Sequence, residues 1–121
     1  MADFPFETTV GATAYQVRLD IFDFPKDPNG ASATFKMITD ETIDGGTPTT
    51  KINAATATIT EVTDHLDGTW DIRLTYTFTA ANLDTADDYL GQWKATYSDA
   101  SIMYFPFTST QKMKIRVNAI L

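Results

Sequence analysis

The chain has 121 residues, a formal net charge of -7 and no cysteine, and this length is typical of one domain. The lack of cysteine excludes a disulfide framework, a thiolate metal site and a cysteine nucleophile. The acidic charge opposes binding to the phosphate backbone of nucleic acid, so we expect no nucleic-acid partner.

The sequence contains no apolar run long enough to cross a membrane as a helix, and residues 1–6 lack the basic start and apolar run of a signal peptide. With 43% hydrophobic residues, the chain can bury enough apolar surface to fold. We therefore expect a soluble domain that has no membrane partner and is made in the cytoplasm of the producing cell.

The N-terminal segment, residues 1–14, is predicted to be an arm that precedes the folded domain of residues 15–121. It combines Phe4, Pro5, Phe6 and Gly11 with no alternation of apolar and polar residues. Arms of this kind dock either on their own domain or on a neighbouring subunit, and the sequence leaves both possibilities open.

Alternation of apolar and polar residues predicts strands with one buried face. The clearest case is 69–78, where one face carries five large apolar side chains: Trp70, Ile72, Leu74, Tyr76 and Phe78. Residues 79–88 predict a single turn of helix, which Thr79 or Asp84 could cap. Seven strands are predicted in all, at 15–22, 31–38, 52–62, 69–78, 89–97, 102–107 and 111–120.

The segments between these strands are rich in Pro, Gly, Asn and Asp, which favour chain reversals. Seven short strands separated by such turns are typical of an all-β domain, and we predict an immunoglobulin-like antiparallel β-sandwich.

No catalytic, cofactor-binding or metal-binding residue is predicted. His65 is the only histidine, lies in a turn and is interpreted as solvated, and no serine has the context of a nucleophile elbow. Glu61 and Asp71 should point outward from the sheet, so they do not suggest an acid–base pair. The cluster Asp84, Asp87 and Asp88 lacks a calcium-loop pattern. We therefore predict that the protein is not an enzyme and needs no cofactor.

Three features are candidate protein interfaces. Pro106 places its segment at a strand edge or end, because proline has no N–H for an interior ladder, and apolar edges are either covered by the same domain or used for contact. The basic side chains of the last strand share one face. We interpret this face as a solvated outer face, and a contact stripe is the alternative. The candidate residues are the arm residues Phe4, Pro5 and Phe6, the edge residues Tyr104, Phe105, Pro106 and Phe107, and the stripe residues Lys112, Lys114 and Arg116.

The order of these features resembles the immunoglobulin-like domain of bacteriophage virion proteins, best represented by the N-terminal domain of siphophage upper baseplate proteins. The segments that carry the resemblance are ATFKM at 33–37, INAATA at 52–57, GTWDIRLTY at 68–76, TAANLD at 79–84, YLGQWKA at 89–95 and Tyr104-Phe105-Pro106. The resemblance covers about residues 15 to 118. The family commonly has Pro-Gly or Ala-Gly before the tyrosine that corresponds to Tyr89, where this chain has Asp87-Asp88.

This resemblance implies a virion structural protein. The expected partners are other virion proteins, namely the major capsid protein or tail and baseplate subunits, together with copies of the chain itself as a homo-oligomer on the particle. Because the sequence ends directly after its last predicted strand, a capsid decoration (cement) protein is placed ahead of a tail, neck or baseplate component. A carbohydrate-binding module is the alternative of a different class, because it uses the same fold.

Overall fold

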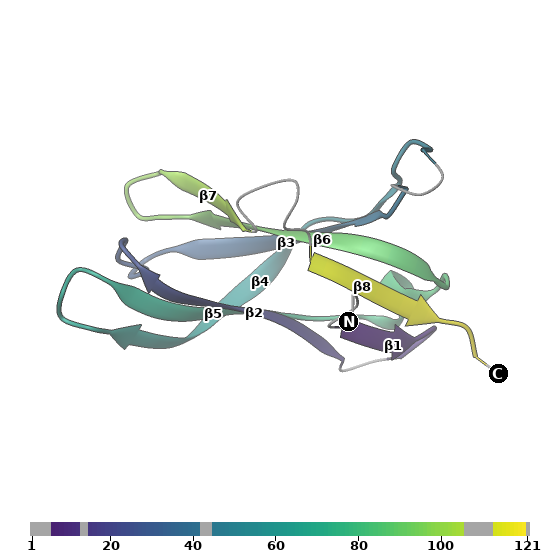
Figure 1. The fold of residues 1–121 in the computed structure, drawn as a ribbon, viewed down its shortest axis with the longest axis horizontal. Helices are drawn as coiled ribbons and strands as arrows, with labels where there is room; N and C mark the ends of the chain where they lie inside the picture. The colour runs from purple at the N-terminus through teal and green to yellow at the C-terminus, as the bar shows by residue number, and fades with distance from the viewer. Residues whose placement is uncertain (1–5, 13–14, 42–44, 106–112, 121) are drawn as a thin grey trace.

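The computed structural model describes residues 6–12, 15–41, 45–105 and 113–120, and the chain it shows is all-β (Figure 1). Each of the seven predicted strands is present, and in the described ranges the bounds agree with the predicted ones to within a few residues. Positions 106–107 and 111–112 of the last two predicted strands lie outside the described residues. No helix in the described ranges has the length and apolarity needed to cross a membrane. The elements are β1 (Phe6–Thr9), β2 (Gln16–Phe24), β3 (Ser32–Thr39), β4 (Thr50–Asp64), β5 (Trp70–Thr77), the 3₁₀ turn η1 (Ala80–Leu83), β6 (Asp87–Thr96), β7 (Ile102–Phe105) and β8 (Met113–Asn118).

The strands form two packed layers, and β4 belongs to both (Figure 1). Its first half pairs with β3 up to Ala57, and its second half pairs with β5 from Thr58 onward. One layer therefore contains β1, β8, β6 and β3, with β7 also paired to β6, while the other contains β5 and β2. This strand order is that of an immunoglobulin-like β-sandwich, which confirms the predicted fold class.

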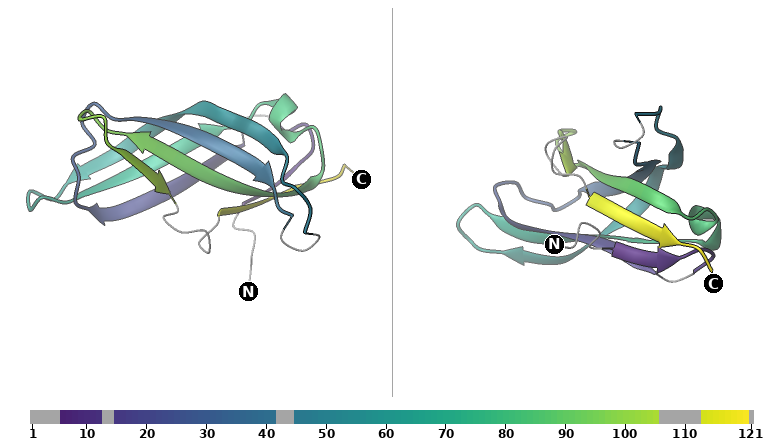
Figure 2. Two further views of the ribbon diagram at one scale, coloured as in Figure 1. Left: turned by 90° about the horizontal axis from the view of Figure 1, so that it is seen from above. Right: turned by 45° about the vertical axis from the view of Figure 1, so that its right-hand side comes forward.

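An eighth strand, β1, lies in the segment predicted to be an arm that precedes the first strand. It runs parallel to β8, with Phe6 opposite Ile115 and Thr9 opposite Asn118 (Figure 2), so the sandwich is not purely antiparallel. The residues after β1 also contact the domain, since the Gly11 N–H donates to the Leu83 carbonyl at 2.8 Å. The described part of the arm, residues 6–12, therefore docks on its own domain, and four residues were too few to show alternation.

The core lies between the layers and is built from the inward residues of the alternating strands. Phe35 of β3 is fully buried, and its ring centroid lies 4.6 Å from that of Trp93 and 5.2 Å from that of Tyr76. In β5, Ile72 and Leu74 are buried as predicted, while Tyr76 and Trp70 keep part of their surface exposed. Aromatic packing of this kind joins the two layers.

The turn η1 begins with the predicted cap. The Thr79 side chain accepts a hydrogen bond from the Asn82 N–H, and the Asn82 side chain accepts one from the Thr79 N–H at 3.0 Å. This reciprocal pair is a capping box. Asp84, the other predicted cap, ends the turn instead of starting it.

Gly91 of β6 lies against the core, where a side chain has no room. A Cβ placed there would lie 2.9 Å from Cε1 of Phe35 and 3.2 Å from Cδ1 of Ile115. We expect Gly91→Ala to lower the free energy of unfolding by about 1–3 kcal/mol, because an overpacked core must shift its side chains. Chemical denaturation measures this loss. Gln92→Ala, one position along the same strand but exposed, should change stability by no more than about 0.5 kcal/mol, and equal losses in the two variants would contradict this explanation.

Candidate functional site

An open hollow of about 360 Å³ lies on the outer face of the layer that contains β3, β6 and β7. The strand register explains its composition, because Thr34 lies opposite Lys94, and Lys94 lies opposite Tyr104. Side chains two positions apart on a strand share a face, which adds Lys36 and Gln92. The hollow is lined by Thr34, Lys36, Ala54, Gln92, Trp93, Lys94 and Tyr104.

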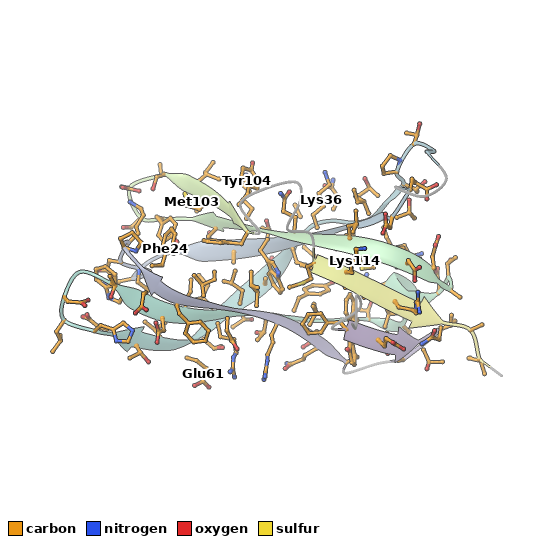
Figure 3. All side chains as sticks on the ribbon, in the orientation of Figure 1. Phe24, Lys36, Glu61, Met103, Tyr104 and Lys114 are labelled. Carbon is orange, nitrogen blue, oxygen red and sulfur yellow. The ribbon has the colours of Figure 1, made fainter. Side chains whose placement is uncertain are left out.

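The hollow is basic and has an aromatic rim. Within the described part of the chain, neither Lys36 nor Lys94 forms an ion pair, although the whole chain has a net charge of -7. The Tyr104 side chain is 49% exposed and projects, like Lys36, from the outer side of this layer (Figure 3). Two lysines beside an exposed tyrosine suit a ligand or partner that presents carboxylates next to apolar surface.

The predicted edge residues divide between the surface and the core. Tyr104 faces outward at the hollow, whereas Phe105 is 1% exposed, and its ring centroid lies 5.5 Å from that of Phe24 across the core. The Phe105 side chain therefore has no surface to offer a partner. Pro106 and Phe107 lie outside the described residues.

The other two candidate groups are only partly described. Phe6 packs against the core, and Phe4 and Pro5 lie outside the described residues. Lys114 and Arg116 share the outer face of β8 as predicted. The Arg116 guanidinium forms an ion pair with Asp88 at 2.9 Å, so it is held within the domain. Lys112 is also outside the described residues.

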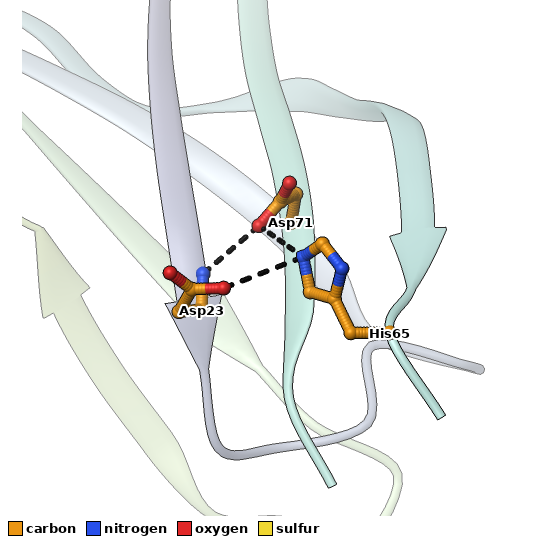
Figure 4. Close-up of side chains that lie close together, drawn as sticks. All are labelled: Asp23, His65 and Asp71. Atoms are coloured by element: carbon orange, nitrogen blue, oxygen red, sulfur yellow. Dashed lines mark hydrogen bonds and ion pairs between the residues drawn. The ribbon is translucent and has the colours of Figure 1, made fainter. Parts of the chain in front are cut away.

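A second cluster lies in the other layer, where the β4–β5 turn comes close to β2 and β5 (Figure 4). Nε2 of His65, in the turn between β4 and β5, lies 2.8 Å from Oδ1 of Asp71 and 3.4 Å from Oδ1 of Asp23. The Asp23 backbone N–H donates to Oδ1 of Asp71 at 2.9 Å. His65 is exposed, as expected, but it also joins two carboxylates from neighbouring strands, which the sequence analysis did not predict.

The two charged partners shift each other's titration. The hydrogen bond to Asp71 raises the pKa of His65 above its usual value, assisted by the charges of Asp71, Asp23 and Asp67. The same hydrogen bond lowers the pKa of Asp71, with a further contribution from the Asp23 N–H. A histidine with a raised pKa stabilises the fold fully below its unfolded pKa of about 6.5. That stabilisation is lost as the pH rises through the higher folded value.

This shift can be measured directly because the chain has one histidine. In chelator-treated protein, we expect the imidazole NMR signals to titrate with a midpoint above about 6.5. In Asp71→Asn the midpoint should fall, because the carboxylate that favours the protonated ring is gone. The same midpoint in both proteins would show that the hydrogen bond does not form in solution.

Comparison with known proteins identifies no family for this chain. No family model matches the sequence, and no curated protein matches it. Among solved structures, the chain is similar to murine CRIg, with 12% sequence identity and a TM-score of 0.38, over 97% of this chain and 94% of that one. At this level of similarity, the likeness supports no conclusion about function.

Proposed function

We propose that the protein is a structural component of a bacteriophage virion and that it decorates the capsid shell. The sequence resemblance over about residues 15 to 118 supports a virion role. The observation that best supports docking to a partner is the basic hollow at Lys36, Lys94 and Tyr104. Its partners would be the major capsid protein and neighbouring copies of the chain.

The hollow supplies the interactions that a docking surface needs. Lys36 and Lys94 can each donate charge-assisted hydrogen bonds to carboxylates of a partner. Tyr104 and Ile102, which are 49% and 45% exposed on the same edge strand, can bury apolar surface beside them, and tyrosine is enriched at interfaces. The net charge of -7 makes other contacts between copies repulsive on average, which favours docking through this basic hollow.

The hollow lies on the outer face of its layer, where a partner can reach it. Lys36, Gln92, Lys94 and Tyr104 lie on the solvent side of a sheet whose opposite side is the core, whereas the Trp93 side chain packs in that core. A partner would therefore meet a preformed surface. A preformed surface binds with less loss of conformational entropy than one that must order first. This property suits a part that is added to an already assembled shell.

A tail, neck or baseplate component is the alternative placement within the same class. The copy number on purified particles distinguishes the two placements. Quantitative mass spectrometry should give, for a decoration protein, a number of copies that scales with the capsid protein, whereas a tail component should give only the small number of copies of a ring. Absence of the protein from purified particles would contradict both placements.

A carbohydrate-binding module has less support. It would need two or three aromatic side chains exposed on one sheet face or in loops. In the described ranges the strongly exposed aromatic side chains are Phe22 and Tyr104, and they lie on β2 and β7, in different layers. A glycan-binding assay with the isolated domain tests this alternative.

A further inference from the structure

Three different segments place metal-ligating side chains together at one end of the sandwich. Asp23 comes from β2, His65 from the β4–β5 turn and Asp71 from β5, and one ligand atom from each lies within 4.8 Å of the others (Figure 4). They are separated by up to 48 positions along the chain. The register of the strands, rather than closeness in sequence, therefore brings them together.

A β-bulge aims Asp23 at this cluster. The pairing of β2 with β5 shifts between Ile21 and Phe24, and Asp23 has a φ of 53°, in the left-handed region that is unfavourable for most non-glycine residues. Bulges often redirect a side chain and are common beside functional sites. The hydrogen bond from the Asp23 N–H to Asp71 holds this conformation.

The distances suit a small divalent ion. In a tetrahedral zinc site, metal–ligand bonds of about 2.0–2.2 Å place the ligand atoms about 3.3 Å apart. Nε2 of His65 already lies 3.4 Å from the Asp23 oxygen. Its 2.8 Å separation from the Asp71 oxygen is that of a hydrogen bond, and it would widen by about half an ångström when an ion replaces the shared proton.

The local charge also favours a cation. Among the described residues, no lysine or arginine pairs with Asp23 or Asp71, and the nearby charge of Asp67 acts on the same histidine. The acidic cluster considered in the sequence analysis differs in this respect. There, Asp84 pairs with Lys51 and Asp88 pairs with Arg116, so those carboxylates already have cationic partners.

We infer that Asp23, His65 and Asp71 bind a divalent transition metal ion, with zinc the best match, and that water completes its coordination. An imidazole nitrogen with two carboxylates suits zinc, whereas calcium and magnesium require more oxygen ligands. The ion ties the edge strand β2 to the β4–β5 turn and thereby stabilises this end of the sandwich. This inference is independent of the proposed virion role.

Zinc titration of the full, chelator-treated chain tests the site. Calorimetry should show one ion bound per chain, and the NMR signals of the single imidazole should shift on binding. Because zinc binds the folded state, the melting temperature should rise with zinc concentration. His65→Asn and Asp23→Asn should each weaken binding by about tenfold or more, since even changes to residues that only support metal ligands have effects of this size.

Asp67→Asn is the matched control. It removes a carboxylate from the same turn but retains an oxygen that can accept the hydrogen bonds from Thr69, so zinc affinity should change much less. Circular dichroism of the metal-free variants establishes that each is folded. Unshifted imidazole signals in the wild-type chain, equal zinc affinity in His65→Asn, or tighter binding of calcium than of zinc would each overturn the inference.

Discussion

Phe35→Ala should lower the free energy of unfolding by about 3–5 kcal/mol, the range observed when a buried phenylalanine is truncated. Phe35 is fully buried, and its ring contacts aromatic side chains of both layers, with centroid distances of 4.6 Å to Trp93 and 5.2 Å to Tyr76. Its removal leaves a cavity that these large, packed rings cannot readily fill. A domain of this size is stable by only about 5–15 kcal/mol, so a large part of its stability would be lost.

Denaturant titration followed by tryptophan fluorescence measures this effect, because Trp93 lies beside the substituted ring. Phe22→Ala is the matched control, since Phe22 is 69% exposed and its truncation should change stability by no more than about 0.5 kcal/mol. A Phe35→Ala variant as stable as Phe22→Ala would mean that the core is not centred where the structure places it.

The second large effect concerns docking. If the hollow binds carboxylates of a partner, the double variant Lys36→Glu, Lys94→Glu should bind particles at least about 100-fold more weakly, because reversal replaces attraction by repulsion, and removing one partner of a buried charge pair alone costs about 2–5 kcal/mol. Both side chains lie on the outer face, so the variant should remain folded. Co-sedimentation with particles that lack the protein measures the loss.

A comparison of single charge reversals separates a local effect from one of overall charge. Lys94→Glu lies in the hollow, whereas Arg18→Glu lies on exposed surface of β2 in the other layer, and each changes the net charge equally. Only Lys94→Glu should weaken binding substantially. Equal losses in the two variants, or no loss in the double variant, would show that the hollow is not the docking surface.

The fold was predictable because most strands are long enough to show alternation. Ten residues with five apolar side chains on one face identified β5. The four residues of β1 carry Phe6 and Thr8 inward and Glu7 and Thr9 outward, which is too short and too mixed a pattern to detect. The crossing of β4 between layers was also hidden, because a strand of 15 residues looks the same in sequence whether it serves one sheet or two.

The sites were much less predictable, because they depend on which strands are neighbours. Lys36, Gln92 and Lys94 occupy polar positions of correctly predicted strands, but only the register with β7 places them beside Tyr104. The histidine cluster likewise depends on a bulge at Asp23 and on the pairing of β2 with β5. The sequence carries no local signal for either feature beyond the residue types themselves.

Cryo-electron microscopy of particles that contain the protein tests the proposed role most directly. We predict repeated density for this sandwich on the outer surface of the capsid shell, with the face of Lys36, Lys94 and Tyr104 turned toward the capsid protein or a neighbouring copy. Density confined to a ring on the tail, or shell density with this face turned to solvent, would contradict the account.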